Sequence, residues 1–253
     1  MGMSDLHYKI IVPMYNVENW IGKNLLMIKQ QDYENFQCVV CDDMSTDGSI
    51  DAAKTAIDGD SRFSLITNKE KKFALRNIYE SIIYSNPEDD DVIATVDGDD
   101  WLANAGVLSI IKEYYESSDI MMTYGSYIRW PTGEMSSLSM YPDWVIKQNA
   151  FRDYQWMATH LRTFKYNLWK RINKEDLLGD DGDFYKMAWD LAFGFPMLEM
   201  SSGKFKHISD TLYVYNRDNP INDDKVNKDL QLGLDKVIRR KPKYLPLEFS
   251  DDI

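Results

Sequence analysis

The sequence predicts an α/β fold in which a mostly parallel central sheet is flanked by helices on both faces. Short apolar runs that end in polar or turn residues alternate with segments whose apolar residues recur at helical spacing. Strands separated by helices in this way form parallel sheets that are covered on both sides. Polar side chains also follow the ends of successive runs, and ligands of parallel sheets bind beyond the carboxyl ends of the strands.

The first half of the chain contains the expected strands and helices in alternation. Each strand is a short apolar run; the runs are residues 8–15, 37–42, 62–68, 91–97 and 119–126. Each helix is marked by apolar residues on one face; these are Ile21, Leu25 and Ile28, then Ile50, Ala53 and Ile57, then Ala74, Ile78 and Ile82, and then the segment 106–115. This order predicts helical crossovers between parallel strands.

The second half is rich in Trp, Tyr and Met and shows weaker periodicity. We expect residues 187–200 to form a helix that is broken at Gly194 or Pro196, because both residue types interrupt helices. Residues 206–216 alternate in polarity and are expected to form a strand. We therefore divide one domain into residues 1–126 and 127–253, with the second part closing one side of the polar edge.

Charge and hydropathy exclude several classes of partner. The formal net charge is −12, which disfavours nucleic acid and anionic membranes. No apolar run approaches the roughly 18 residues of a membrane span, and the first residues lack the apolar core of a signal peptide. We expect a cytoplasmic protein without a transmembrane segment; the sequence leaves homo-oligomer formation open.

A basic cluster near the end of the chain is a local exception to this acidic character. Its members are Lys236, Arg239, Arg240, Lys241 and Lys243. The cluster is either a solvated end segment or a docking patch for an anionic acceptor, and the sequence leaves both interpretations open.

The two cysteines, Cys38 and Cys41, have the C-x-x-C spacing of redox and zinc sites. The flanking sequence "NFQCVVCDD" predicts a buried strand, in which positions three apart point to opposite faces. A redox pair also needs a helix after the first cysteine, and a zinc site needs further ligands. We therefore expect two thiols in the core.

Two aspartates follow the fourth expected strand in the sequence "TVDGDDW". Asp97 and Asp99 are two apart, so in an extended segment their carboxylates face the same way, and Gly98 allows a tight turn between them. Mg²⁺ and Mn²⁺ commonly bind one or two protein carboxylates together with substrate phosphates. The motif therefore predicts a divalent metal site, although an acidic turn that caps the next helix is the alternative.

A set of motifs makes the chain resemble a known family. "IVPMYNVENWI", "VVCDDMSTDGS", "ALRN" (74–77) and "TVDGDDW" occur in order, and "WDLAF" and "LYVYN" follow later. Together they resemble the GT-A glycosyltransferases, in particular the large inverting family 2. The resemblance implies a Rossmann-like sheet, with the nucleotide-sugar bound by residues 1–126. Residues 127–253 would bind the acceptor and supply the catalytic base.

The resemblance also implies roles for individual residues and for a cofactor. Mn²⁺ or Mg²⁺ would bind Asp99 and Asp97, and the donor would be a nucleotide-sugar, with UDP-sugars favoured. The remaining donor-site residues would be Pro13 and Tyr15 as the wall around the base, Asp42 as its hydrogen-bond acceptor with Asp43 beside it, Arg76 facing the base or phosphates, and Asp97 near the ribose or sugar.

Departures from the family pattern occur near the nucleotide motifs. Leu75 is inserted within the A-R-N motif, and Met44 stands where family members commonly have glycine. Lys71 and Lys72 replace a loop that often contains glycine. These lysines either contact phosphates or face solvent.

The resemblance places the catalytic base at the start of a helix well after the metal motif. We favour Asp190, because a carboxylate among Trp189, Leu191 and Phe193 is costly to bury unless it has a partner or a function. Desolvation would also raise the pKa of such a carboxyl, which suits a general base. The competing acidic cluster, Asp180, Asp181 and Asp183, is flanked by glycine and is expected to be an exposed loop.

Two histidines and one arginine complete the candidate site. His160 and Arg162 are two apart, so on a strand they share a face and are candidates for contact with the acceptor or the diphosphate. His207 lies on the expected strand 206–216, and some GT-A enzymes use a late histidine as a third metal ligand.

These features favour an inverting, metal-dependent transfer of a sugar to a hydroxyl on a saccharide or another acceptor. A nucleotidyltransferase on a related fold is the first alternative, but it usually needs a basic, Gly-rich loop where this chain has "PMYNVENW". A non-catalytic protein that binds nucleotides or sugars is the second. No G-x-G-x-x-G follows the first strand and no P-loop motif occurs, which argues against dinucleotide and P-loop sites.

Overall fold

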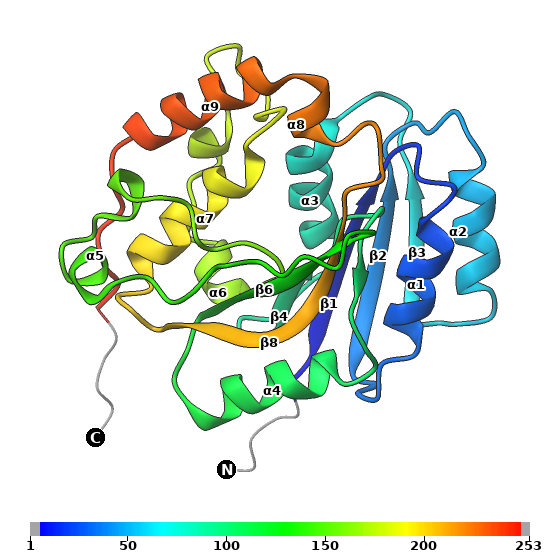
Figure 1. Ribbon diagram of the computed structural model, residues 1–253, viewed down its shortest axis with the longest axis horizontal. Coiled ribbons are helices and arrows are strands. Elements are labelled where there is room, and N and C mark those ends of the chain that lie inside the picture. The colour runs from blue at the N-terminus through cyan, green and yellow to red at the C-terminus, as the bar shows by residue number, and fades with distance from the viewer. Residues whose placement is uncertain (1–5, 249–253) are drawn as a thin grey trace.

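The computed structural model describes residues 6–248 and confirms the expected α/β architecture (Figure 1). An eight-stranded sheet has the order β3-β2-β1-β4-β7-β6-β8-β5. The strands are β1 (Tyr8–Met14), β2 (Phe36–Asp42), β3 (Phe63–Thr67), β4 (Val92–Thr95), β5 (Trp101–Leu102), β6 (Met122–Trp130), β7 (Arg162–Lys165) and β8 (Phe205–Asn216). β1, β2, β3 and β4 pair in parallel, as the alternation of strands and helices predicts.

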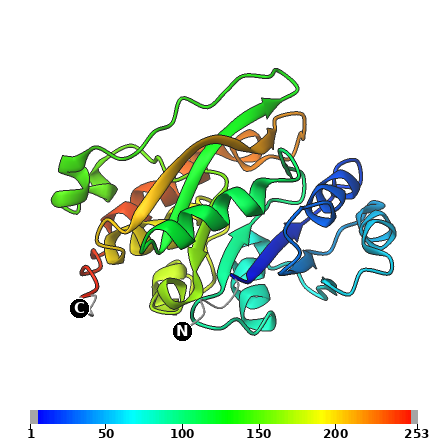
Figure 2. The ribbon, with the colours of Figure 1, turned by 90° about the horizontal axis from the view of Figure 1, so that it is seen from below.

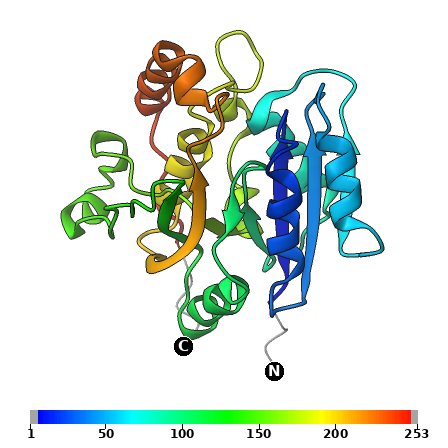
Figure 3. The ribbon, with the colours of Figure 1, turned by 45° about the vertical axis from the view of Figure 1, so that its right-hand side comes forward.

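Helices cover both faces of this sheet. They are α1 (Ile21–Lys29), α2 (Ser49–Ile57), α3 (Phe73–Tyr84), α4 (Val107–Ser117), α5 (Asp143–Lys147), α6 (Tyr166–Trp169), α7 (Trp189–Met200), α8 (Asp223–Val226) and α9 (Lys228–Arg240), with short 3₁₀ turns at Phe151–Asp153 and Lys174–Leu177. Figure 3 shows α1 and α2 side by side on one face. Figure 2 looks from below onto α4, which crosses in front of β6 and β8.

Alternate residues of β1 supply the two halves of the core. Ile10 and Val12 pack with α1, α2 and α4, whereas Ile11 packs with α3, α6 and α7 on the opposite face. This is the period-2 alternation of a strand that is buried on both sides. Cys38 and Cys41 of β2 are buried free thiols, which confirms the prediction for them.

The second half of the chain continues the same sheet. β7, which the sequence did not predict, pairs antiparallel with both β4 and β6 and so connects the two parts. β8 then runs parallel to β6. The division expected between residues 126 and 127 falls inside β6. Within residues 6–248, no helix is both long and apolar enough to cross a bilayer.

The helix expected to break at Gly194 or Pro196 is instead continuous from Trp189 to Met200. The residues from Leu191 to Met200 are all buried, so packing compensates for the hydrogen bond that proline removes, a loss of about 3 kcal/mol. Gly194 has a different role: a methyl group built on its Cα would overlap the indole of Trp156. This glycine therefore permits close packing of a side chain against the helix.

Candidate functional site

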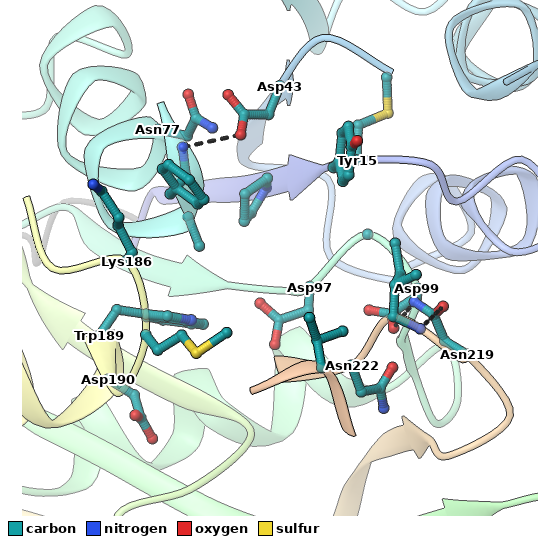
Figure 4. Close-up of a pocket in the computed structure, with 18 of the residues that line it drawn as sticks. Tyr15, Asp43, Asn77, Asp97, Asp99, Lys186, Trp189, Asp190, Asn219 and Asn222 are labelled. Atoms are coloured by element: carbon teal, nitrogen blue, oxygen red, sulfur yellow. Dashed lines mark hydrogen bonds between the residues drawn. The ribbon is translucent and has the colours of Figure 1, made fainter. Parts of the chain in front are cut away.

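A cavity of about 600 Å³ lies beyond the carboxyl ends of β1, β2 and β4 and is lined by both halves of the chain (Figure 4). The first half contributes, among others, Pro13, Tyr15, Asp43, Lys71, Asn77, Asp97 and Asp99. The second half contributes, among others, His160, Arg162, Lys186, Trp189, Asp190, Asn219 and Asn222. Most of the predicted site residues therefore line one cavity, although they come from segments far apart in sequence.

One end of the cavity is built from the last residues of β1 and the residue that follows the strand. Pro13 and Tyr15 both line it, and Tyr15 is 37% exposed. The ammonium group of Lys71 lies 2.7 Å from the centre of that ring and 3.3 Å from Oδ2 of Asp43. Lys71 therefore lies inside the site, whereas the ammonium of Lys72 pairs with Glu80 at 2.6 Å.

Asp43, rather than the neighbouring Asp42, reaches the cavity. Its carboxylate accepts hydrogen bonds from the backbone N–H groups of Lys72 (2.7 Å) and Phe73 (2.9 Å). Burial opposes ionisation, but these bonds, the Asn77 amide and the Lys71 charge outweigh it and hold the pKa of Asp43 below its ordinary value. The buried carboxylate of Asp42 instead accepts the N–H of Ser45, 3.2 Å from Oδ2.

The A-L-R-N segment opens α3 and presents asparagine, not arginine, to the cavity. Arg76 does not line it; its guanidinium pairs with Glu70 (3.1 Å) and Glu80 (2.9 Å). Asn77 is buried and lines the cavity, and its Oδ1 accepts from Asn68 at 2.7 Å. Its Nδ2 interacts with the nearby Asp43 carboxylate but makes no hydrogen bond of good geometry among the described residues, so it can also donate to a ligand.

Gly98 brings the metal motif against β1. A Cβ at this position would lie 2.9 Å from the carbonyl oxygen of Pro13 and 2.8 Å from Cβ of Met14, so only glycine fits. The flanking Asp97 and Asp99 both line the cavity. Asn219 donates to Oδ2 of Asp99 at 2.7 Å (Figure 4), although burial still raises the pKa of that carboxyl.

The acidic and histidine side chains that come together here are Asp97, Asp100 and His160. One potential ligand atom from each lies within 4.8 Å of the others, and Asp99 is not part of this group. Burial, followed by the charges of Asp99 and Asp97, raises the pKa of Asp100 well above its ordinary value. Both oxygens of Asp100 already accept hydrogen bonds, from the hydroxyl of Tyr213 (2.8 Å) and the N–H of Asn216 (2.7 Å). A cation would relieve the remaining repulsion, so the group is a candidate site for a divalent metal ion.

His160 has the properties of a neutral metal ligand. Burial and the charge of Arg162 lower its pKa well below the ordinary value, so the imidazole is uncharged at neutral pH. Its ring stacks on Tyr213, with ring centres 4.7 Å apart, and Nδ1 has no hydrogen-bond partner within residues 6–248. The late histidine considered from the sequence, His207, does not line the cavity; its Nε2 lies 3.2 Å from Oγ of Ser126.

Asp190 lines the cavity from the first turn of α7, next to Trp189 (Figure 4). It is not the isolated carboxylate that its apolar neighbours suggested. The indole N–H of Trp156 donates to its Oδ2 at 2.9 Å, and Nη1 of Arg162 lies 3.5 Å from the same oxygen. The acidic loop with Asp180, Asp181 and Asp183 is exposed, as expected, and does not line the cavity.

A family comparison accords with this arrangement of carboxylates around a cavity at the sheet edge. The sequence profile of "Glycosyl transferase family 2" matches residues 9–174, which is more than half of the chain. This chain belongs to glycosyl transferase family 2. The prediction made from the motifs is confirmed at this level.

Two relatives from the family illustrate the extent of the similarity. The chain is 32% identical over 126 residues to the Escherichia coli UDP-Glc:alpha-D-GlcNAc-diphosphoundecaprenol beta-1,3-glucosyltransferase WfgD, a match that covers 49% of this chain and 47% of WfgD. It is 34% identical over 92 residues to the putative glycosyltransferase EpsE of Bacillus subtilis, covering 36% of this chain and 32% of EpsE. The matches therefore span less than half of either relative.

Solved structures share the fold at low sequence identity. Staphylococcus aureus TarS (residues 1–349) in complex with UDP-GlcNAc superimposes with a TM-score of 0.65 and 16% identity, covering 85% of this chain and 59% of TarS. The mannosyltransferase PcManGT from Pyrobaculum calidifontis, in complex with GDP-Man and Mn²⁺, superimposes with a TM-score of 0.56 and 16% identity. That match covers 87% of this chain and 59% of PcManGT. Both confirm the fold class of this family 2 domain.

Several residues of the family 2 site were missed in the sequence. Asn77 and Asp100 are each one position from residues that were chosen: Asn77 lines the cavity, and Asp100 lies beside Asp97 and His160. Asn219 and Asn222 follow β8, where the rule that ligands bind beyond strand ends would have indicated them.

Most residues of the basic cluster near the C-terminus bind other parts of the chain. Nη1 of Arg239 donates to the carbonyl oxygens of Arg152 and Tyr154, both at 2.8 Å. Lys241 donates to the carbonyl of Leu178 at 3.1 Å, and Lys243 pairs with Asp153 at 2.9 Å. The remaining members, Lys236 and Arg240, are exposed.

Proposed function

We propose that this chain is a metal-dependent, inverting glycosyltransferase that moves a sugar from a UDP-sugar to an acceptor hydroxyl. The arrangement of the cavity carries the proposal. Tyr15 and Asp43 form one end, Asp97 and Asp99 lie at its centre, and Asp190 faces it from the other half of the chain. This order suits a nucleotide, a diphosphate with its metal, and a reacting sugar in succession.

The nucleotide end suits a base that offers both an N–H donor and acceptor oxygens. The ionised carboxylate of Asp43 accepts hydrogen bonds, and the neighbouring Lys71 and Asn77 can donate them. Uracil presents an N–H between two carbonyl oxygens, which matches this pattern. Names of related proteins add support: WfgD uses UDP-Glc, and TarS binds UDP-GlcNAc, whereas PcManGT binds GDP-Man.

Asp97, Asp100 and His160 would hold the metal ion, and Asp99 stays a candidate ligand from the motif. A mixed set of carboxylates and an imidazole suits Mn²⁺ better than Mg²⁺, which prefers oxygen ligands only. When bound, the ion would offset the negative charge that develops on the leaving diphosphate. PcManGT, which shares the fold, was solved with Mn²⁺.

Arg162 would supply a positive charge to the same leaving diphosphate. Its side chain is 1% exposed, and its Nε and Nη1 have no hydrogen-bond partner among the described residues. Nη1 only approaches the Asp190 carboxylate, at 3.5 Å. A buried guanidinium whose donors are incompletely satisfied is costly, and a phosphate oxygen of the donor would complete its hydrogen bonds. We therefore assign Arg162 to the diphosphate rather than to the acceptor, the two contacts that the sequence left open.

In the transfer, the acceptor oxygen forms a bond to the anomeric carbon while the bond from that carbon to the diphosphate oxygen breaks. The nucleoside diphosphate leaves with the bonding electrons, and the hydroxyl proton passes to the carboxylate of Asp190. Attack from the side opposite the leaving group inverts the anomeric centre. The acceptor is a saccharide or another hydroxyl-bearing molecule; in WfgD it is a GlcNAc-diphosphoundecaprenol.

Calorimetric titration of the protein with UDP and GDP, with and without Mn²⁺, tests the donor site. We expect tight binding of UDP that requires Mn²⁺ and weakens at least tenfold in Asp97→Ala and His160→Ala, because each removes a metal ligand. Asp210→Asn, a change of an exposed carboxylate, is the matched control and should bind as the unmodified chain does. Absence of binding to both nucleotides would refute the proposal and favour a different ligand class.

Release of UDP from UDP-glucose and UDP-N-acetylglucosamine, with water as acceptor, tests the chemistry. Asp190→Asn should lower the rate by about 100-fold or more while UDP still binds, because the proton acceptor is lost and the residues assigned to the nucleotide and metal are unchanged. Near-normal turnover in this variant would refute the assignment of the base. Binding without any turnover would instead support the non-catalytic alternative, and formation of a UDP-sugar from UTP and a sugar phosphate would support a nucleotidyltransferase.

A further inference from the structure

Trp156 is a residue behind the cavity whose side chain reaches Asp190. It lies between the 3₁₀ turn Phe151–Asp153 and β7, and it is not among the residues that line the cavity. Its indole N–H donates to Oδ2 of Asp190 at 2.9 Å. The contact joins positions 34 apart in the sequence, so it exists only in the folded chain.

We propose that Trp156 is a positioning residue that holds Asp190 by one carboxylate oxygen and leaves the other oxygen to accept the acceptor proton. This inference rests on the proposed function, in which Asp190 is the general base. Within residues 6–248, both polar contacts of the Asp190 carboxylate, from Trp156 and from Arg162, involve Oδ2. Oδ1 is therefore the oxygen that remains for the proton.

The packing of the indole explains why the contact is rigid. Asp190 and Gly194 are four residues apart on α7, so they lie on the same face of the helix. The indole lies along this face, with its benzo ring against Gly194 and its N–H at Asp190. Any larger residue at position 194 would overlap Cη2 of Trp156 and displace the ring. The ring of Phe195 packs edge-on against it, with centres 5.1 Å apart.

The helix itself provides a fixed platform for this pair. α7 is buried along nearly its whole length, and Asp190 is in its first turn, where the helix dipole favours a negative charge. A carboxylate held from behind by an indole on a buried helix cannot rotate freely toward its neighbours. The consequence for catalysis is alignment, because misplacement of a reacting group by about 1 Å can cost about 100-fold in rate.

Other charged and titratable groups near Asp190 come from segments other than the one that carries Trp156. Arg162 approaches from β7, and Lys186 lines the same cavity from the segment before α7. Tyr141, in the segment before α5, feels the charge of Asp190, but burial is the main cause that raises its pKa. A change in the pH dependence of a Trp156 variant therefore reports the loss of its N–H.

The contact can be tested without turnover by following the indole N–H signals of the seven tryptophans by NMR. The Trp156 signal is identified by its loss in Trp156→Phe. Its chemical shift should change with pH as the Asp190 carboxylate takes up a proton, and this change should be absent in Asp190→Asn. The Trp169 signal is the internal control, because that ring stacks on Phe164 in the same core and makes no hydrogen bond to Asp190 among the described residues. A Trp156 signal that is unaffected by Asp190→Asn would overturn the proposal.

The consequence for the reaction is tested by the pH dependence of UDP release from the UDP-sugars. Loss of a donor to the carboxylate favours its protonated form, so in Trp156→Phe the acidic limb of kcat/KM should move to higher pH by about one unit. The kcat should fall about 10- to 100-fold with little change in the KM for donor, since the donor site is untouched. Trp169→Phe is the matched control and should leave the limb in place.

Two further variants keep the test decisive if Trp156→Phe folds poorly. A benzothiophene analogue of tryptophan at position 156 keeps the shape and removes only the N–H, so it should show the same shift of the acidic limb. Gly194→Ala should reproduce this shift by displacing the ring. An unchanged limb in all three variants would overturn the proposal, whereas normal turnover in Asp190→Asn would overturn the proposed base instead.

Discussion

A buried ion pair anchors the second half of the chain, and its removal should be strongly destabilising. Nε of Arg152 lies 2.5 Å from Oε1 of Glu199, and Nη2 lies 3.0 Å from Oε2. The two side chains are 3% and 0% exposed. The same guanidinium donates to the carbonyl of Ile238 in α9, and Glu199 also accepts the N–H of Tyr244. The pair therefore connects α7, α9 and the segment that follows α9.

Glu199→Ala leaves the Arg152 charge buried without its partner and the Tyr244 N–H unpaired. Loss of one member of a buried pair costs about 3–5 kcal/mol, and each kcal/mol lowers Tm by about 2–4 °C in a chain of this length, so we expect a decrease of about 10 °C. Calorimetric melting measures the change in Tm, and urea unfolding measures the change in the free energy of unfolding. Both should agree on the size of the loss.

The matched control is an ion pair on the surface. Asp89→Ala removes the partner of Lys170, where the side chains are 57% and 38% exposed, and should cost no more than about 1 kcal/mol. The double variant Arg152→Met with Glu199→Leu removes both charges and should be more stable than Glu199→Ala alone. Equal losses in Glu199→Ala and Asp89→Ala would refute the reasoning.

Further predictions concern the donor end of the cavity and its backbone. Because the pKa of Asp43 is lowered on folding, its stabilising contribution is complete above pH 4 or so and is lost as the pH falls below its ordinary value of 3.8. The difference in urea stability between the unmodified chain and Asp43→Asn should therefore be constant from about pH 7 to pH 5 and shrink below about pH 4; a difference that grew on acidification would contradict the assigned direction. Gly98→Ala should weaken UDP binding at least tenfold by calorimetry, because the new methyl would press on the Pro13 carbonyl; unchanged affinity would show that the loop adjusts freely. Met44 has a left-handed φ of +65°, a conformation that glycine adopts with less strain. Met44→Gly should therefore raise the free energy of unfolding by about 1 kcal/mol. A lower free energy of unfolding would show that the backbone at Met44 is not strained.

The fold was largely predictable from local patterns. Strands and helices of the first half appeared where apolar spacing indicated them, because burial on both faces of a sheet imposes that spacing. β7 was missed because a run of only four residues carries little periodic signal. The supposed break in α7 was wrong because helix propensity is a weak preference that complete burial overrides.

The motifs bring most of the predicted site residues to one cavity, but not every side chain that was chosen reaches it. Pro13, Tyr15, Asp97 and Asp190 line the cavity as their motifs suggested. Arg76 does not, because a one-residue step in the first turn of a helix rotates the side chain by about 100° and places it over Glu80 instead. Spacing along the sequence does not settle such rotations at the junctions between loops and helices.

The sequence by itself determined the alternation of strands and helices, the family, and the set of polar segments that meet at one sheet edge. These follow from periodicity and from the rule that parallel strands end together. Only the tertiary structure decided that His160 rather than His207 joins the carboxylates, and that Trp156 and Arg162 hold Asp190. These contacts join residues tens of positions apart, and no local period connects them; they arise when the second half of the chain packs onto the sheet.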